Sequence, residues 1–309
     1  MPAAAAVIDH KIFMARIPPK TRQLLLGRSD RAGLVHLGLH WGATALVSVP
    51  IYTQVPFWWA LLPVQGILII FNFTLLHECT HQSPFRSLWL NEAVGWITGA
   101  AVGLPFIWFR YFHLAHHRFT NDPARDPELA GGPRPQNLGS YTLHITGLPV
   151  WKSQVLTLFS NAVGGGSGDF LPKSVGGKIQ IESILLLLFY IVTAVYSFTV
   201  SGVLLWLWFV PILLGQPFLR LYLLAEHGRC PPVASMLENS RTTITNRIVR
   251  FLAWNMPYHA EHHCFPMVPF HQLPALHQLA KPYLQTTEQG YVRFNQKYLK
   301  ALGTSLKID

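Results

Sequence analysis

The stretch His77-Glu-Cys-Thr-His81 is the first of four histidine clusters, each at or near the end of an apolar segment. The others are His113-Leu-Ala-His116-His117, Glu226-His227 and His259-Ala-Glu-His262-His263. Histidines three and four residues apart share one face of a helix, so each cluster can direct its imidazoles toward one point. Imidazole is a common ligand of iron, zinc and copper, and nine such ligands exceed what one metal uses. The clusters therefore predict two metal ions. The clusters also constrain the fold. The apolar segments between them must return the chain to the same side of the membrane, because otherwise the histidines could not meet.

Composition indicates a membrane protein. Half of the 309 residues are hydrophobic, only 12% are charged, and the mean hydropathy is +0.27. The formal net charge of +10 comes from basic residues scattered beside apolar segments, so we expect membrane topology rather than a nucleic-acid partner to explain it. Cys79, Cys230 and Cys264 form no disulfide pattern, which fits a reducing compartment.

Four apolar segments are long enough to cross a bilayer. The first has 19 residues, which cover ~28 Å at helical rise. The short links within each pair of segments contain no Lys or Arg, whereas the N-terminus, the central loop and the C-terminal region hold nearly all of them. We therefore predict that all histidine clusters and both termini lie on the cytosolic side. The predicted spans are residues 34–52, 57–76, 179–200 and 203–224.

These features predict an all-α membrane protein with about four transmembrane helices in two hairpins, plus interfacial helices and a cytosolic-side, histidine-rich di-iron site. A surface helix is expected over 141–160, a flexible loop over 164–169 and a helix over 246–254. The predicted divisions are an interfacial N-terminus (1–33), a membrane domain (34–285) and a C-terminal tail (286–309).

Residues 88–109 pose a topological question. They are apolar enough to span, but a single crossing would place His113 on the opposite side of the membrane from His81. The segment must therefore return, either as a re-entrant or interfacial helix pair or as two crossings. Gly95, Gly99 and Gly103 predict close packing of its helix.

A site of many imidazoles and few carboxylates favours a redox-active iron pair that activates O2 against a lipid C–H bond. His77-Glu-Cys-Thr-His81 also fits the H-E-x-x-H motif of zinc proteases with Glu78 as general base, but that alternative leaves six histidines unexplained. A metal transporter would place its ligands near the bilayer midplane. The six remaining histidines lack partner spacing and are predicted at the surface: His10, His36, His40, His144, His271 and His277.

The order and spacing of the clusters resemble the integral-membrane fatty acid desaturase superfamily, over residues 34–277. Asn255-Met-Pro-Tyr258 before His259 resembles the start of the family's third histidine box, and His227 resembles the additional histidine after the last span. By this resemblance, one iron is held by His77, His117, His227, His259 and His263. The other is held by His81, His113, His116 and His262, with a water. Acyl-CoA desaturases of the family hold that water with an Asn four residues before the extra histidine; here Leu223 occupies the position and Glu226 is the expected substitute.

The resemblance implies a di-iron oxygenase that uses O2 and two electrons to desaturate a fatty acyl chain or acyl lipid in the bacterial inner membrane or the endoplasmic reticulum. A hydroxylase or ketolase of a lipid-like substrate stays open, because no motif fixes the substrate carbon relative to the oxidant. No His-Pro-Gly-Gly haem motif is present, so a separate electron donor of the ferredoxin, rubredoxin or cytochrome b5 type is expected. Arg241, Arg247 and Arg250 are candidate contacts for this acidic partner. The alternative is that they fix the membrane topology or bind lipid head groups.

Metal-bound imidazoles usually donate their second N–H to a carboxylate or a carbonyl. The candidate acceptors of these bonds are Glu78, Asp122, Asp126, Glu226, Asn255 and Glu261. For each of them the alternative is a helix cap or a solvated surface position.

Overall fold

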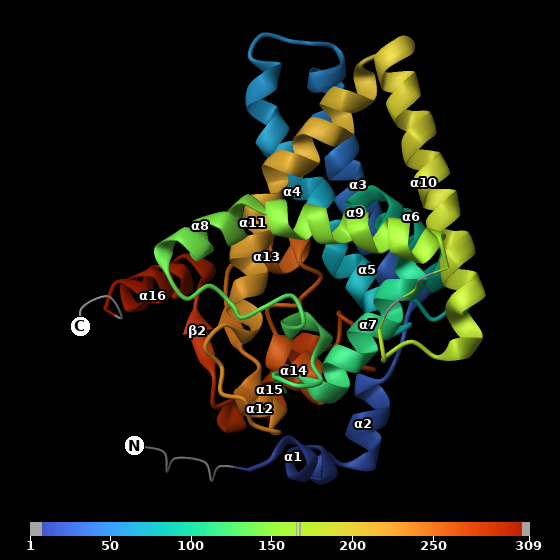
Figure 1. Cartoon of the computed structure of the whole chain (residues 1–309). Coiled ribbons are helices and arrows are strands. Elements are labelled where there is room, and N and C mark those ends of the chain that lie inside the picture. The colour runs from blue at the N-terminus through green and yellow to red at the C-terminus, as the bar shows by residue number, and fades with distance from the viewer. Residues whose placement is uncertain (1–7, 165, 167, 305–309) are drawn as a thin grey trace.

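The computed structural model describes residues 8–164, 166 and 168–304. Residues 1–7 and 305–309 of the predicted terminal segments, and residues 165 and 167 of the predicted loop, lie outside this part. The described chain is mostly helical, and four of its helices are long and apolar enough to cross a membrane, as predicted. Figure 1 shows them as an upright group above a layer of shorter helices. The candidate spans are Pro19–Tyr52, Trp58–Thr80, Lys173–Thr199 and Leu205–His227.

The first hairpin consists of α3 (Asp30–Tyr52) and a returning span that contains α4 (Leu62–Ile70) and α5 (Asn72–Thr80). Ser29 caps α3 by accepting a hydrogen bond from the Ala32 N–H at 3.2 Å, so the helix begins before the apolar stretch predicted from residue 34. The returning span extends past the predicted end at residue 76 and carries the first histidine cluster as its last turn.

The second hairpin consists of α10 (Gly176–Thr199), a π-helical turn η4 (Leu205–Phe209) and α11 (Val210–His227). The sequence predicted that the last span would end at residue 224. Instead α11 continues through Glu226 and His227, so this histidine is held on a helix rather than on a loop.

The two hairpins meet where α4 crosses α11. A Cβ atom on Gly66 would lie 2.0 Å from the carbonyl oxygen of Pro211, and one on Gly215 would lie 2.3 Å from the carbonyl oxygen of Gly66. Only glycine fits at either position without moving backbone. The helices therefore touch backbone to backbone, the close approach that small residues permit between membrane helices.

Residues 88–109 form parts of two helices, α6 (Leu88–Val102) and α7 (Phe106–Phe119), which are bent by 96° relative to each other. Gly103 ends α6 in the left-handed conformation (φ 79°). A Cβ on Gly95 would lie 2.3 Å from the ring of Phe106, so the predicted close packing is present and the ring of one helix seats against the backbone of the other. A sharply bent pair fits the predicted return of the chain and not a straight crossing.

A buried carboxylate fixes the start of α7. Glu182 of α10 is fully buried and accepts hydrogen bonds from the backbone N–H groups of Ile107 and Trp108, at 2.9–3.3 Å. These are unpaired donors of the first helical turn, where negative charge is favourable.

Replacing Glu182 with alanine is expected to lower the stability of the protein by about 1–3 kcal/mol, because buried N–H groups lose their acceptor. Reversible unfolding in mixed micelles, followed by circular dichroism, measures the change. Thr193→Ala on the same helix is the control, since the Thr193 hydroxyl bonds only backbone carbonyls of its own helix. Equal midpoints for the two variants would contradict the capping role.

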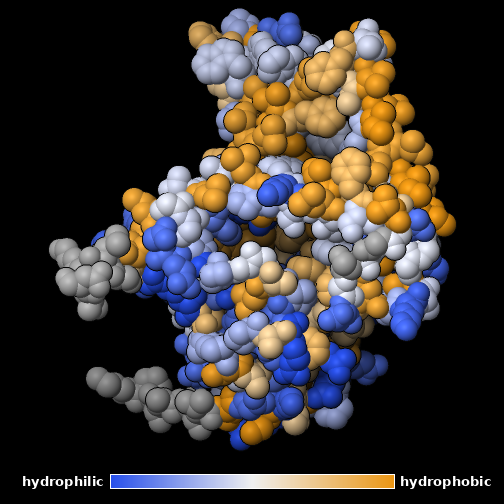
Figure 2. Space-filling view, viewed as in Figure 1, coloured by the Kyte–Doolittle hydropathy of each residue, from blue (hydrophilic) through white to orange (hydrophobic). Residues whose placement is uncertain are grey.

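Two helices, α8 (Leu138–Thr146) and α9 (Leu148–Ala162), lie across the lower part of the long helices (Figure 1). The sequence predicted one helix over 141–160. Gly147, in the left-handed conformation (φ 72°), divides it in two, and Pro149 lies in the first turn of the second helix, where proline is favoured. Figure 2 shows apolar surface concentrated over the long helices and polar surface below this level. The pair thus marks the boundary that an interfacial helix would occupy.

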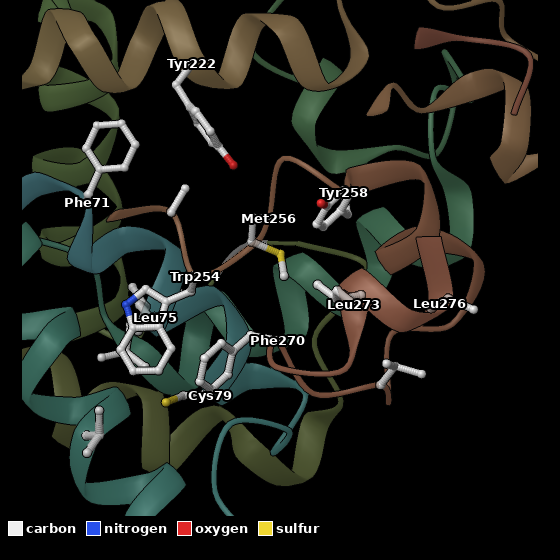
Figure 3. Packing of buried hydrophobic residues seen from close by; sticks show 14 of the residues in the cluster. Phe71, Leu75, Cys79, Tyr222, Trp254, Met256, Tyr258, Phe270, Leu273 and Leu276 are labelled. Atoms are coloured by element: carbon white, nitrogen blue, oxygen red, sulfur yellow. The ribbon is translucent and has the colours of Figure 1, made fainter. Parts of the chain in front are cut away.

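The polar half is a set of short elements around α14 (His259–Cys264). The fold departs from the all-α prediction only in a parallel pair of short strands, β1 (Thr242–Ile244) and β2 (Thr287–Gln289). Figure 3 shows Trp254 beside Leu75 of α5, with Met256, Phe270 and Leu273 in the same buried cluster. The helix predicted over 246–254 is α13, and the elements of this half are α1 (His10–Arg16), α2 (Pro19–Leu25), α12 (Met236–Asn239), α13 (Arg247–Leu252), α15 (Leu273–Ala280) and α16 (Tyr291–Thr304).

Candidate metal centre

Helix ends bring all four histidine clusters to one buried region. The first cluster lies at the end of α5, the second on the last two turns of α7, His227 at the end of α11, and the fourth on α14. Eight of the nine side chains are buried and His117 is partly buried. The geometry thus joins residues that the sequence separates by almost 190 positions.

The imidazole nitrogens fall into two groups. In one group, five ligand nitrogens lie within 4.8 Å of one another, and in the other, three do. His259 adjoins the smaller group, because its Nε2 lies 2.9 Å from Nε2 of His227. The first group is His77, His81, His113, His117 and His262, and the second is His116, His227 and His263.

This grouping differs from the one that the family resemblance implied, in which His117 and His113 serve different metals. Residues four apart on a helix differ in direction by about 40°, whereas residues three apart differ by about 60° to the other side. On α7, His113 and His117 therefore point together, and their Nε2 atoms lie 2.9 Å apart. His116 points toward the other group, where its Nε2 lies 3.1 Å from that of His227.

The donor set fits nitrogen-preferring metal ions. Nε2 atoms of His81 and His113 are 3.0 Å apart, and those of His117 and His262 are 3.2 Å apart. An imidazole pair can share one proton, but five nitrogens converging on one point cannot all be satisfied in this way. Nε2 of His77 and Nε2 of His263 are buried without a hydrogen-bond partner. A cation in each group would satisfy these nitrogens together.

Burial favours the neutral form of these imidazoles, which is the form that binds metal. Desolvation lowers the pKa of His81 to about 3 and lowers the pKa of His262 and of His263 well below the ordinary value of histidine. His116 is the exception, because the carboxylates of Glu128 and Asp126 raise its pKa in spite of its burial.

Several second ring nitrogens face oxygen atoms. Nδ1 of His116 lies 2.9 Å from Oδ1 of Asp126, and Nδ1 of His259 lies 3.3 Å from Oε1 of Glu226. Glu78, also predicted, is 3.6 Å from Nδ1 of His262. The hydrogen bond with Asp126 orients the His116 ring so that Nε2 faces the cluster, while Glu226 and Glu78 lie within ion-pair distance of their histidines. Glu226, which we expected to hold a water, lies against a histidine.

Other contacts of this kind were not predicted from the sequence, and we describe the two shorter ones. Nδ1 of His263 lies 3.1 Å from the hydroxyl of Thr120, and Nδ1 of His227 lies 3.2 Å from the backbone carbonyl oxygen of Asn239. The position of Thr120, three residues after His117, was the only available signal for the first contact. A backbone carbonyl carries no residue-specific signal at all.

Three other predicted acceptors contact none of the nine rings through a hydrogen bond. Asp122 pairs with Arg125 near the surface, and the Asn255 side chain donates to the carbonyl of Phe270. Glu261 is fully buried between Thr242 and His277, which both hydrogen-bond its carboxylate. Its partners lie on β1 and α15, so this side chain ties α14 to its neighbours.

Three surface predictions are wrong. His277 is buried because α15 packs its inner face on α14, and His40 is fully buried, with Nε2 2.9 Å from the carbonyl oxygen of Leu68. Arg241 is also buried: its guanidinium donates to the carbonyl oxygens of Ala225 and Gly228. It therefore fixes the turn after α11 and is not available to a redox partner.

Replacing Asp126 with asparagine is expected to weaken metal retention about 10–100-fold, because the His116 imidazole loses a charged acceptor for its N–H. Competition with a chelator, with metal measured by elemental analysis, gives the change. Asp122→Asn is the matched control, since Asp122 lies four residues earlier and pairs only with residues of its own exposed turn. Equal retention in both variants would contradict the role of Asp126.

The fatty acid desaturase family model matches residues 53–295, a range that contains all nine clustered histidines. The chain belongs to the fatty acid desaturase family. The family match, the candidate membrane helices and the buried histidine cluster confirm the resemblance that we described from the sequence.

Curated relatives of this desaturase-family protein act on several lipids. It is 27% identical to the sphingolipid delta(4)-desaturase of Gallus gallus, over 73% of this chain and 67% of the relative. It is 26% identical to a fatty acid conjugase of Calendula officinalis, over 79% of this chain and 72% of the relative. The match to the sn-1 acyl-lipid omega-3 desaturase (ferredoxin) of Nostoc sp. is 28% identical and covers 38% of this chain but only 33% of the relative. The matches thus span between a third and three quarters of these relatives.

Proposed function

We propose that the protein is a membrane di-iron desaturase that removes two hydrogens from a fatty acyl chain or an acyl lipid. The observation that carries the proposal is the pair of buried imidazole groups at the ends of membrane helices. The balance requires one O2, two electrons and two protons, which together with the two substrate hydrogens give two waters and one carbon–carbon double bond.

The ligands we propose are the nine clustered histidines, five for one iron and four, including His259, for the other. When bound, the irons supply the redox chemistry that activates O2. The chain supplies the remaining functions: Asp126 accepts the Nδ1 proton of His116, so that Nε2 stays free for metal, and the Glu226 carboxylate lies 3.3 Å from Nδ1 of His259. Burial of the whole cluster keeps bulk water from the reacting atoms.

We place the cluster and both termini on the cytosolic side, where a chain from the bilayer and electrons from water can both reach it. The electron donor we propose is a separate ferredoxin, rubredoxin or cytochrome b5 type protein; one relative carries ferredoxin in its name. Arg247 is exposed and remains a candidate contact for this partner, whereas Arg250 donates to the hydroxyl of Tyr258 at 2.8 Å.

A hydroxylase or ketolase uses the same metal site and differs in the product. The zinc protease alternative uses only His77, His81 and one further ligand, whereas the structure gathers nine histidines in one region. The observed convergence therefore favours a two-metal oxygenase.

The test is metal content together with Mössbauer spectroscopy of iron-57-labelled protein, followed by mass spectrometry of lipids from expressing cells. We expect about two spin-coupled irons per chain and a lipid product two mass units lighter than its precursor. A product heavier by one oxygen would indicate hydroxylation. One zinc and no iron from iron-replete cells would overturn the proposal.

A further inference from the structure

A cavity of about 620 Å³ lies on the polar side of the protein, between the loop that follows the second histidine cluster and helix α16. Its size falls within the range of about 300–1,000 Å³ that encloses small molecules, and exceeds the needs of a bare inorganic anion. Among the described residues, no acidic side chain lines it. The lining residues that matter here are Leu129, Arg134, Arg229, Tyr298 and Leu302.

The charge of this cavity is unbalanced. Nη2 of Arg134 is buried and has no hydrogen-bond partner among the described residues. The guanidinium of Arg229 lies 4.5 Å from the ring centre of Tyr298 and donates to the carbonyl oxygen of Tyr298 at 3.2 Å. It forms no ion pair with a carboxylate in the part of the chain that the structure describes. Two guanidinium groups beside one cavity, one with a buried free donor, favour an anionic ligand.

The arginines are held on a fixed frame. The Tyr298 hydroxyl donates to the carbonyl oxygen of Pro135 at 2.7 Å, which ties α16 to the loop that carries Arg134. Arg229 follows the end of α11 in the left-handed conformation (φ 60°), and the buried Arg241 bonds the carbonyl of Gly228 beside it. A pre-positioned pair of donors binds an anion at low entropic cost.

The cavity adjoins the metal centre through short stretches of chain. Arg229 stands two residues after His227. On the other wall, the 3₁₀ turn Pro127–Leu129 directly follows Asp126, the partner of His116. An anion in the cavity would therefore be anchored beside the reacting region.

We propose that this cavity binds the phosphate of a lipid head group, so that the substrate is an acyl chain carried on a phospholipid. This inference rests on the proposed desaturase function. Two guanidinium groups suit the several oxygens of a phosphate, which each fork can bind in pairs. Leu129, Leu302 and the prolines of the loop provide apolar surface for the glycerol and the first carbons of the chain.

The test uses the full chain, purified with its iron in detergent micelles, and dioctanoyl phosphatidic acid as the probe in titration calorimetry. Dioctanoylglycerol, which has the same chains without phosphate, is the matched ligand, and inorganic phosphate is the competitor. We expect phosphatidic acid to bind at least about tenfold more tightly than dioctanoylglycerol, since charge-assisted bonds to the phosphate are lost in the latter.

Arg134→Gln is expected to weaken phosphatidic acid binding by about tenfold or more, and Arg229→Gln similarly. Arg293→Gln is the control, because Arg293 lies on α16 and is exposed outside the cavity, so it removes the same charge. Iron content shows that each variant is folded. Equal binding of the two lipids, or an equal effect of all three substitutions, would overturn the proposal. Inorganic phosphate binding as tightly as the lipid would assign the site to a free anion and overturn it as well.

Iron and lipid products are measured on the same wild-type preparation. If the protein holds two irons and forms a double bond but binds both lipids equally, the head-group assignment is wrong and the proposed function stands. A protein that lacks iron overturns the proposed function and removes this inference with it.

Discussion

Replacing His113 with alanine is expected to lower desaturation by at least about a hundredfold and to release metal from the five-histidine group. Nε2 of His113 lies 3.0 Å from that of His81 and 2.9 Å from that of His117, so this ring lies between two other ligand candidates. Its loss leaves a gap that the neighbouring imidazoles, fixed on α5 and α7, cannot fill. Product formation and iron per chain, measured on one preparation, report both effects.

The control for His113→Ala is His271→Ala. The His271 ring contacts the carbonyl oxygen of Gly27 at 3.2 Å and lies outside the two nitrogen groups. Both substitutions remove an imidazole, but only the first should change the iron content. Full activity in His113→Ala would remove His113 from the ligand set and would call the five-histidine group into question.

Replacing Glu261 with alanine is expected to lower the stability of the protein by about 3 kcal/mol, the second large effect. The Glu261 carboxylate is fully buried and is bonded by both Nδ1 of His277 and the hydroxyl of Thr242. Its removal leaves two buried polar groups unpaired. The ring of Tyr258 stacks on His277, with ring centres 4.7 Å apart, so the disturbance reaches the residue that directly precedes α14.

Denaturant titration in mixed micelles, followed by tryptophan fluorescence, measures the effect of Glu261→Ala. Glu238→Ala on α12 is the control, because it removes a partly exposed carboxylate from a helix that packs on α14. An equal midpoint for the two variants would show that the buried pair contributes nothing to stability. His277→Ala should reproduce most of the loss, since it breaks the same pair from the other side.

The membrane helices could be predicted because their signal is local. Length and apolarity are properties of consecutive residues, and each of the four predicted segments contributes to a helix long enough to span. The boundaries were less predictable. Ser29 extended α3 through a cap, and Gly147 divided the expected surface helix, because each acts through backbone geometry that hydropathy does not describe.

The convergence of the nine histidines was also predictable, since span parity and charge placed all clusters on one side. The division of the histidines into two groups was not predicted correctly. The angular offsets of about 40° and 60° between the histidines of α7 would have indicated it. Contacts between elements that are distant in the sequence could not be predicted from it. His277 has no nearby partner along the chain, and the carbonyl of Asn239 that faces His227 belongs to no recognisable motif.

The contact of α4 and α11 at Gly66 and Gly215 is the point about which the two helices would rotate relative to each other. His77 lies eleven residues beyond Gly66 and His227 twelve residues beyond Gly215, so two arms of about 16–18 Å extend from the contact point to the metal centre. Rotation by about five degrees at the pivot would displace the arm tips by about 1.5 Å, more than the tolerance of a metal–nitrogen bond. Backbone contact at the pivot leaves no side chain that could relax into a second position. The distance between His77 and His227 at one end of the molecule therefore depends on the absence of a side chain at Gly66 and at Gly215, within the membrane helices.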